Sequence, residues 1–293
     1  MKKMIPVLCS LILVLSGCQA KYQRISFDGD TPGEQFNHIN ADTRVENTVD
    51  ADFSTSMPIY KISERNISQQ EYDQMLEALE LPGNPRHSDL EGNRLFYNLA
   101  SFVDSSRGYF ELSDEEVEKL AWEIFNKIPF LEGEFECLGI KDTYTINDST
   151  GDHIARAGVS FRRLLDGVRV IGEDNCTLYF DGSGLVAIRM ALFEYEQTGT
   201  MDMIPVEEAA DRINAPDNFI FDAVDASQEI GVADTLEVER INLLLVNHYS
   251  RGCTILQPVY SFVGTATDSK GAEAVFKSII IAIPEAYTYE AKS

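Results

Sequence analysis

The chain contains 293 residues, of which 44% are hydrophobic and 10% aromatic, so it has enough apolar side chains for a packed core and wholesale disorder is excluded. Its 48 acidic residues outnumber its 24 basic residues, which gives a formal net charge of −24. Nucleic-acid-binding proteins and polybasic membrane patches need a surplus of Lys and Arg, so this charge argues against both classes.

The first eighteen residues have the pattern of an export signal. Two lysines at positions 2 and 3 precede an apolar run from Met4 to Leu15, and the sequence Leu-Ser-Gly-Cys ends at Cys18. The apolar run is too short to span a hydrocarbon core of ~30 Å, so a secretory signal over residues 1–17 is expected instead of a transmembrane helix.

The Leu-Ser-Gly-Cys sequence resembles the lipobox of bacterial lipoproteins. That resemblance implies cleavage between Gly17 and Cys18 and a lipid anchor in which the Cys18 thiol carries a diacylglyceryl group, with palmitate as the type of acyl chain. We therefore expect the mature protein to be held at the extracytoplasmic face of the bacterial cell membrane. The alternative is an ordinary signal peptide in which Cys18 is incidental.

Two segments of different composition follow the signal. Residues 18–57 lack sustained hydrophobic periodicity and are rich in Asp, Asn, Thr, Ser and Gly, so we expect a flexible tether that begins at the lipidated Cys18. Residues 58–112 are expected to form a small strand–helix–strand unit. Its helix is opened by a capping box at Ser68 and Glu71, and its later strands flank a turn at Ser105–Gly108.

The remainder shows a helix followed by strands, and then this order again. Ser113 opens the best-marked helix, which ends at Pro129, and a candidate strand pair follows at 135–146. Asp-Gly pairs at 166–167 and 181–182 separate apolar runs and predict two β-hairpins. A short helix after Pro205 then precedes strands at 238–247, 254–265 and 274–283. The recurrence predicts duplicated α+β units.

Three stretches of residues 113–200 resemble the PepSY-like propeptide modules of thermolysin-type proteases and their free-standing lipoprotein relatives. They are the acidic helix start Ser113–Glu116, the FRRLLDGVRV sequence at Phe161–Val170 and the TLYFDGSGLV sequence at Thr177–Val186. Residues 201–293 show the same likeness at Val206–Ala209 and Leu256–Phe262. Tandem units on an anchored, exported chain are also similar to the YycH/YycI-type regulators of a cell-wall sensor kinase.

This resemblance implies an α+β fold in which helices pack on antiparallel meander sheets. Two similar PepSY-like units, 113–200 and 201–293, would stand in tandem after the flexible N-terminal tether. The resemblance also implies a non-catalytic role, either inhibition of a peptidase or modulation of another envelope protein.

The sequence contains no motif for a catalytic, cofactor or metal site. It has four histidines without an H-E-x-x-H pattern, and neither G-x-S-x-G nor a P-loop occurs. His153 and His248 are conceivable metal ligands, but surface or core histidines are the simpler interpretation. The single tryptophan, Trp122, falls on the apolar side of the helix after Ser113, where core packing is expected. We expect no enzyme activity, cofactor or bound metal.

Three cysteines remain in the mature chain besides Cys18. Cys137, Cys176 and Cys253 allow at most one internal disulfide, which an exported protein permits. Buried thiols that pack as small hydrophobic groups are at least as plausible. The sequence alone leaves both possibilities open.

These patterns favour a lipid-anchored, extracytoplasmic, non-catalytic binding or regulatory protein. Besides the membrane, its expected partner is a protein of the cell envelope, such as a peptidase or a sensor kinase, bound by strand addition at an exposed sheet edge. No nucleic acid is expected. Two alternatives are an envelope hydrolase with a dispersed site and a ligand-binding lipoprotein of a transport system.

Overall fold

Strands predominate in the protein. The α-helices of the described part are α1 (Gln69–Ala78), α2 (Asp114–Phe125) and α3 (Val206–Ala210), and Ser105–Arg107 forms a 3₁₀ turn. The computed structural model describes residues 22–23, 42–47, 49, 51–101, 105–149, 151–213, 219–220, 230, 232–249, 252–284 and 288–289.

Sixteen strands lie in these residues and are numbered in chain order. They are β1 (Tyr22–Gln23), β2 (Arg44–Asn47), β3 (Ser56–Glu64), β4 (His87–Glu91), β5 (Arg94–Asn98), β6 (Glu134–Asp148), β7 (Gly151–Leu165), β8 (Val168–Gly172), β9 (Asn175–Asp181), β10 (Gly184–Ala191), β11 (Phe193–Asp202), β12 (Phe219–Ile220), β13 (Ala233–Asn247), β14 (Gln257–Asp268), β15 (Glu273–Ile281) and β16 (Thr288–Tyr289).

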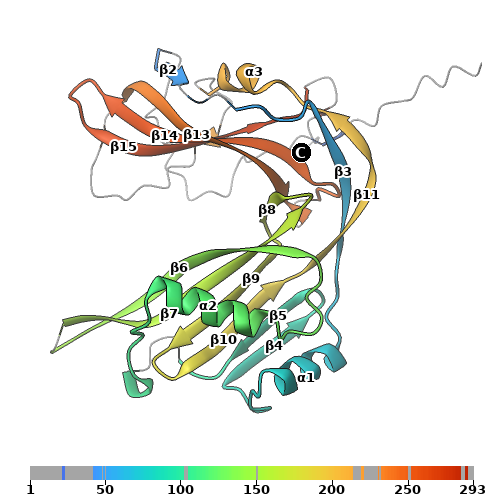
Figure 1. Ribbon diagram of the computed structural model, residues 1–293, viewed down its shortest axis with the longest axis vertical. Helices are drawn as coiled ribbons and strands as arrows, with labels where there is room; N and C mark the ends of the chain where they lie inside the picture. Colours follow the sequence, from blue (N-terminus) through green and yellow to red (C-terminus); the bar gives the residue numbers. More distant parts are fainter. Residues whose placement is uncertain are drawn as a thin grey trace, which may run out of the picture.

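Twelve of these strands form one mixed sheet. Its order is β12–β15–β14–β13–β8–β7–β9–β10–β5–β4, with β2 on β13 and β6 on β7. Figure 1 shows an upper part, with β2, β13–β15 and α3, and a lower part, with β4–β7, β9, β10, α1 and α2. Strand β8 joins the two parts, because Arg169–Gly172 run parallel to Leu244–Asn247 of β13. The antiparallel ribbon of β3 and β11 runs alongside both parts, and β1 pairs with β16 in parallel.

The predicted fold class, helices packed on antiparallel meander sheets in two tandem PepSY-like units, is wrong. The described chain is mostly β, and a single mixed sheet replaces the two expected meanders. The parallel pairing of β8 with β13 is the physical reason, since it fuses the strands that follow α2 with those that follow α3. Helix α3 has only five residues and covers far less of the sheet than α2.

The predicted helix caps and Asp-Gly hairpins are confirmed, whereas two other local predictions are not. Ser68 and Ser113 are N-caps with complete capping boxes, and both Asp-Gly hairpins form, joining β7 to β8 and β9 to β10. A turn does form at Ser105–Gly108, where Ser105–Arg107 is the 3₁₀ turn, but no strand follows it at residues 108–113. The strands β4 and β5 pair instead around the tight turn at Gly92, which has φ of 58°. The pair expected at 135–146 is also wrong, since these residues lie in the single strand β6, which pairs with β7.

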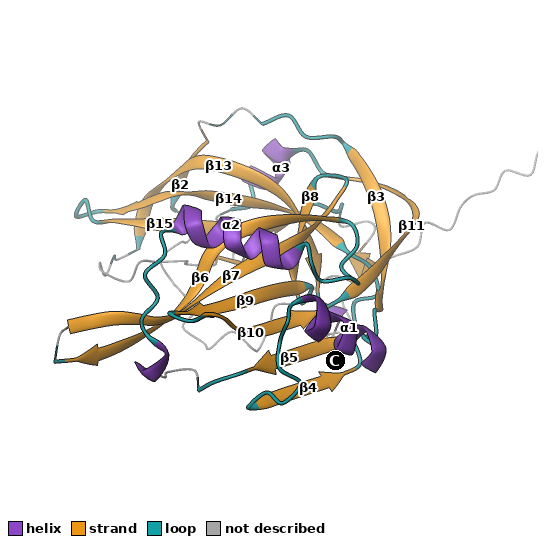
Figure 2. Ribbon diagram, turned by 60° about the horizontal axis from the view of Figure 1, so that its bottom comes forward, coloured by secondary structure: helices purple, strands orange, loops and turns teal. Residues whose placement is uncertain are grey.

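Both large hydrophobic cores lie on the same side of the sheet, which we call face A. In β7, Val159 and Phe161 belong to the lower core and Leu165 packs on the upper core. These residues alternate along one strand and therefore point to one face. Helix α2 crosses β6 and β7 (Figure 2). The Phe125 ring of α2 stacks on the Phe161 ring of β7, with 4.2 Å between the ring centroids. The opposite side of the sheet is called face B.

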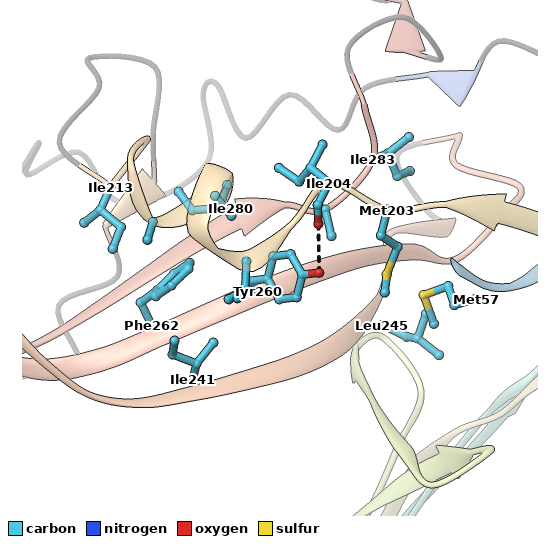
Figure 3. Close-up of a cluster of buried hydrophobic side chains, with 14 of the residues drawn as sticks. Met57, Met203, Ile204, Ile213, Ile241, Leu245, Tyr260, Phe262, Ile280 and Ile283 are labelled. Atoms are coloured by element: carbon cyan, nitrogen blue, oxygen red, sulfur yellow. Dashed lines mark hydrogen bonds between the residues drawn. The ribbon is translucent and has the colours of Figure 1, made fainter. Parts of the chain in front are cut away.

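The upper core is covered by the β3–β11 ribbon and α3. Figure 3 shows Tyr260 and Phe262 of β14 facing this cover, where the Tyr260 hydroxyl donates to the carbonyl oxygen of Ile204 at 3.0 Å. The segment before β3 also docks here. The Thr43 hydroxyl donates to the carbonyl oxygen of Ala233 at 2.8 Å, β2 pairs with β13, and the Phe53 ring lies 5.5 Å from that of Tyr260. The described residues from Thr43 to Met57 are thus bound to the upper core, whereas β1 pairs with β16.

Residues 58–112 contribute to both parts of the molecule. Strand β3 pairs with β11, whereas β4 and β5 extend the large sheet through β10. The hydroxyl of Tyr97 in β5 donates to the carbonyl oxygen of Pro82, 2.9 Å away, which holds the end of the α1 segment against the sheet. This stretch is therefore integrated with strands that lie much later in the chain, since Asn98 of β5 pairs with Ala187 of β10 and Glu64 of β3 pairs with Phe193 of β11.

Candidate interaction surface

The expected lipidation site lies outside the described part of the chain. Gly17 and Cys18, the predicted cleavage and lipidation residues, belong to the undescribed N-terminal segment, so both stay predictions. Among the described helices, none combines the length and the apolar character required to traverse a lipid bilayer.

The three remaining cysteines are thiols. None of Cys137, Cys176 and Cys253 is in a disulfide. Cys137 of β6 and Cys176 of β9 both lie opposite Phe161 of β7. Two strand spacings, about 10 Å, therefore separate their Cα atoms, whereas a disulfide needs less than ~7 Å. Burial raises the pKa of the Cys176 thiol, which makes it a poor nucleophile at neutral pH.

The other residues considered from the sequence lie apart from one another. The His153 ring stacks on Tyr109 with 4.2 Å between centroids, and His248 follows the end of β13. Within the described ranges, no group of three or more His, Cys, Asp or Glu side chains is arranged to hold a metal ion. The Trp122 ring meets Phe161 edge-on at 5.0 Å, which confirms its expected packing role.

A buried polar network occupies the joint between the upper and lower parts. Asp174, only 1% exposed, accepts hydrogen bonds through Oδ2 from Arg163 Nε at 3.1 Å and from the Tyr195 hydroxyl at 2.8 Å. That hydroxyl accepts in turn from Asn247 Nδ2 at 3.1 Å. Desolvation raises the pKa of Asp174, although Arg163 and Tyr195 oppose the shift. These residues come from four segments between positions 163 and 247, so no short sequence motif predicts the network.

This network has the character of a structural joint. The second carboxylate oxygen of Asp174, Oδ1, has no hydrogen-bond partner among the described residues. A buried polar atom without a partner lowers the stability of the folded protein. Beside it, a Cβ on Gly172 would lie 2.1 Å from the carbonyl oxygen of Asn247. The close approach of β8 to β13 therefore requires glycine, and the network holds strand ends together without offering a nucleophile.

The sheet has several edges, and they differ in how well a partner strand fits. Strand β6 shifts register three times against β7, and Gly139 within it has φ of 71°. Such bulges twist an edge away from regular pairing. Strand β15 carries β12 on its outer side at Ile279 and Ser278. Strand β4 has β5 on one side and, within the described residues, no strand on the other.

The outer edge of β4 is open among the described residues, and backbone hydrogen bonds hold the turn that follows the strand. Its residues are exposed except for the partly exposed Leu90. The turn after it is fixed at two points: Gly92 accepts from the Ile67 amide at 2.8 Å, and the carbonyl oxygen of Asn93 accepts from the Leu192 amide at 3.0 Å. A rigid strand with an uncovered edge is a template for strand addition.

The geometry of the hairpin tells which groups point outward. The two-residue loop at Gly92 and Asn93 makes Glu91 and Arg94 a hydrogen-bonded pair, and such pairs alternate along an antiparallel ladder. The amide and carbonyl groups of Ser88 and Leu90 therefore point away from β5. These four groups form the candidate interaction surface.

Sequence reasoning missed β4, although a signal for it exists. Leu90 and Leu95 flank the Gly-Asn pair at 92–93, and a Gly-Asn pair between short strands is typical of a two-residue hairpin. No protein-family model matches the chain, and no curated protein matches its sequence.

Proposed function

We propose that the chain is a lipid-anchored, extracytoplasmic, non-catalytic protein that binds an envelope protein through strand addition at β4. The observation that carries this proposal is the open outer edge of β4, with the backbone groups of Ser88 and Leu90 directed away from the sheet. The signal-like N-terminus and the Cys18 lipobox support the location.

The side chains of β4 suggest the chemistry of the partner. His87, Asp89 and Glu91 alternate along the strand and point to face B, and all three are exposed. Asp89 and Glu91 would stand beside side chains of an added strand, where opposite charges stabilise a cross-strand pair. A partner segment with Lys or Arg at alternate positions fits this edge best.

A proline at the edge tests the proposal. Ser88→Pro removes an outward amide without touching the β4–β5 hydrogen bonds, and Ser88→Thr keeps that amide as the matched control. Tagged full-length variants are purified from native envelopes, and co-purifying proteins are quantified. Proteins enriched by the wild type and by Ser88→Thr should be lost with Ser88→Pro, whose fold is checked by circular dichroism. Equal capture by all three, or no enriched protein, contradicts the proposal.

The anchor is tested separately. Metabolic labelling with a fatty acid should label the wild type and leave Cys18→Ser unlabelled, since the thiol is the expected attachment point. An unlabelled wild type would leave Cys18 as an incidental residue of an ordinary signal peptide. The capture experiment keeps its meaning in either case, because it concerns the edge of the folded sheet.

A further inference from the structure

Basic side chains gather on face B where the upper and lower parts of the sheet meet. Arg240 of β13 and Lys277 of β15 both lie opposite Val263 of β14 and so share one row. Arg169 of β8 lies opposite Leu244, on the same face of the neighbouring strand. This grouping is unusual for a chain with twice as many acidic as basic residues.

These cations lack an equal number of counter-charges. Arg169 forms a bidentate ion pair with Glu136, with both N–O distances at 2.6 Å. Arg240 and Lys277 form no ion pair in the described part of the chain, and the carboxylate of Glu239, next to Arg240, accepts instead from the Thr265 hydroxyl at 2.6 Å. Among the described residues, Arg240 and Lys277 are therefore both available to pair with an added anion.

The pKa of Lys277 reflects the same excess of positive charge. Its pKa is lowered, first by burial and then by the positive charges of Arg169 and Arg240. Among the residues that the structure describes, no carboxylate offsets these two positive charges at the ammonium group. The positive side chains of Arg169, Arg240 and Lys277 therefore repel one another, and a bound anion would reduce this repulsion.

A buried hydroxyl lies beside this row without a partner. Ser261 is 1% exposed, and its Oγ has no hydrogen-bond partner. It precedes Val263 by two residues on β14 and therefore points to the same face, between Asn242 of β13 and Ile279 of β15. Buried polar groups are nearly always hydrogen-bonded, so an orphaned hydroxyl next to unpaired cations points to a missing acceptor.

We propose that face B binds a small oxyanion, a phosphate or a carboxylate, between Arg240 and Lys277, with Arg169 as the third cation and Ser261 as a further donor. The Cα atoms of Arg240 and Lys277 are two strand spacings, about 10 Å, apart. Long basic side chains from both sides reach an anion placed above Val263, and charge-assisted hydrogen bonds to an oxyanion are among the strongest in proteins. This site is separate from the edge of β4 and goes beyond the function proposed above.

The test is calorimetric titration of the purified full-length protein with inorganic phosphate and, in a second arm, with citrate. Chloride keeps the ionic strength constant. The wild type should show saturable binding and a raised Tm, whereas Arg240→Gln and Lys277→Gln should each weaken binding about 10-fold. Lys270→Gln, in the β14–β15 turn outside the row, is the matched control and should bind as the wild type does. Without ligand, Lys277→Gln should have an equal or higher Tm, because repulsion is removed.

Two further measurements distinguish the site from a general attraction to anions. Ser261→Ala should leave the Tm of the ligand-free protein unchanged or raised, because it deletes an orphaned hydroxyl, while it weakens phosphate binding. Equal affinity in the wild type, Arg240→Gln and Lys277→Gln overturns the proposal, as does the absence of saturable binding of either anion. Binding to vesicles containing anionic lipid, without binding of free phosphate or citrate, also overturns it.

Discussion

Replacing Gly172 with alanine tests the joint between the two parts of the sheet. Gly172 ends β8, where it lies opposite Asn247 of the parallel strand β13. A Cβ there would stand 2.1 Å from the Asn247 carbonyl oxygen and 3.1 Å from its carbonyl carbon, and the backbone has φ of +105°. The substitution thus combines a steric overlap with a conformation that disfavours any side chain.

The size of the effect follows from these two terms. A left-handed backbone conformation costs an alanine about 1–2 kcal/mol, and forcing a methyl group into a packed site adds about 1–3 kcal/mol. Gly167 is the matched control, since it has φ of +77° but nothing within 4 Å of its added Cβ. Gly172→Ala should therefore lose about 2–5 kcal/mol of unfolding free energy and Gly167→Ala only about 1–2 kcal/mol.

Urea unfolding followed by two signals measures both variants. Trp122 is the only tryptophan and lies in the lower core, so its fluorescence reports on that part, whereas circular dichroism reports on the whole sheet. The two transitions should coincide in the wild type and shift to lower urea in Gly172→Ala. If Gly172→Ala is no less stable than Gly167→Ala, the close approach of β8 to β13 is not made and the joint is refuted.

Four other outcomes follow from the described contacts. Phe161→Ala should lose about 3–5 kcal/mol, because the ring is fully buried between Phe125 and Trp122; a loss below ~1 kcal/mol by urea unfolding would contradict this packing. Ser113→Ala should lose about 1 kcal/mol with the cap of α2, and an unchanged urea midpoint would argue against the cap. Burial raises the pKa of Asp174, so its contribution to stability is complete below about pH 4 and is lost as the pH rises through the raised value. Unfolding measured across this range should show the wild type losing stability relative to Asp174→Asn with rising pH, and parallel curves would disprove the buried charge. Cys176 should react with a thiol reagent only after unfolding, and rapid labelling of the native protein at this residue would contradict its burial.

The elements that the sequence predicted correctly are those stabilised by interactions between residues close together in the chain. Ser68 and Ser113 cap helices because each satisfies a backbone amide three residues away, and the Asp-Gly pair at 166–167 turns the chain within two residues. All of these interactions lie within a window of a few residues. A single sequence displays them directly.

The order of the strands in the sheet depends on pairing between residues far apart in sequence, and this is why the predicted fold class was wrong. The parallel register of Arg169 with Leu244 joins residues about 75 positions apart, and a parallel pair leaves no turn signature between its strands. The helix-then-strands order of the two halves is the same whether the halves form separate sheets or one. Only the packing of β8 against β13 decides between these arrangements.

The candidate surfaces were hidden for the same reason. The edge of β4 follows from the position of β5 beside β10, which the hairpin sequence around Gly92 does not contain. The cations Arg240 and Lys277 lie 37 positions apart and meet only through their shared partner Val263. A polar or basic residue within a strand is common and predicts no site by itself. Its neighbours on the adjacent strands determine whether it belongs to a binding surface.

Hydrogen exchange at the joint tests the single mixed sheet most directly. If β8 and β13 pair as described, the amides of Arg169–Gly172 and Leu244–Asn247 that form the ladder should be protected to the same extent as those of the β13–β14 ladder. Separate tandem units would leave these amides without partners. Fast exchange at the amides of the β8–β13 ladder, with protection retained in the β13–β14 ladder and in β9, would contradict the account.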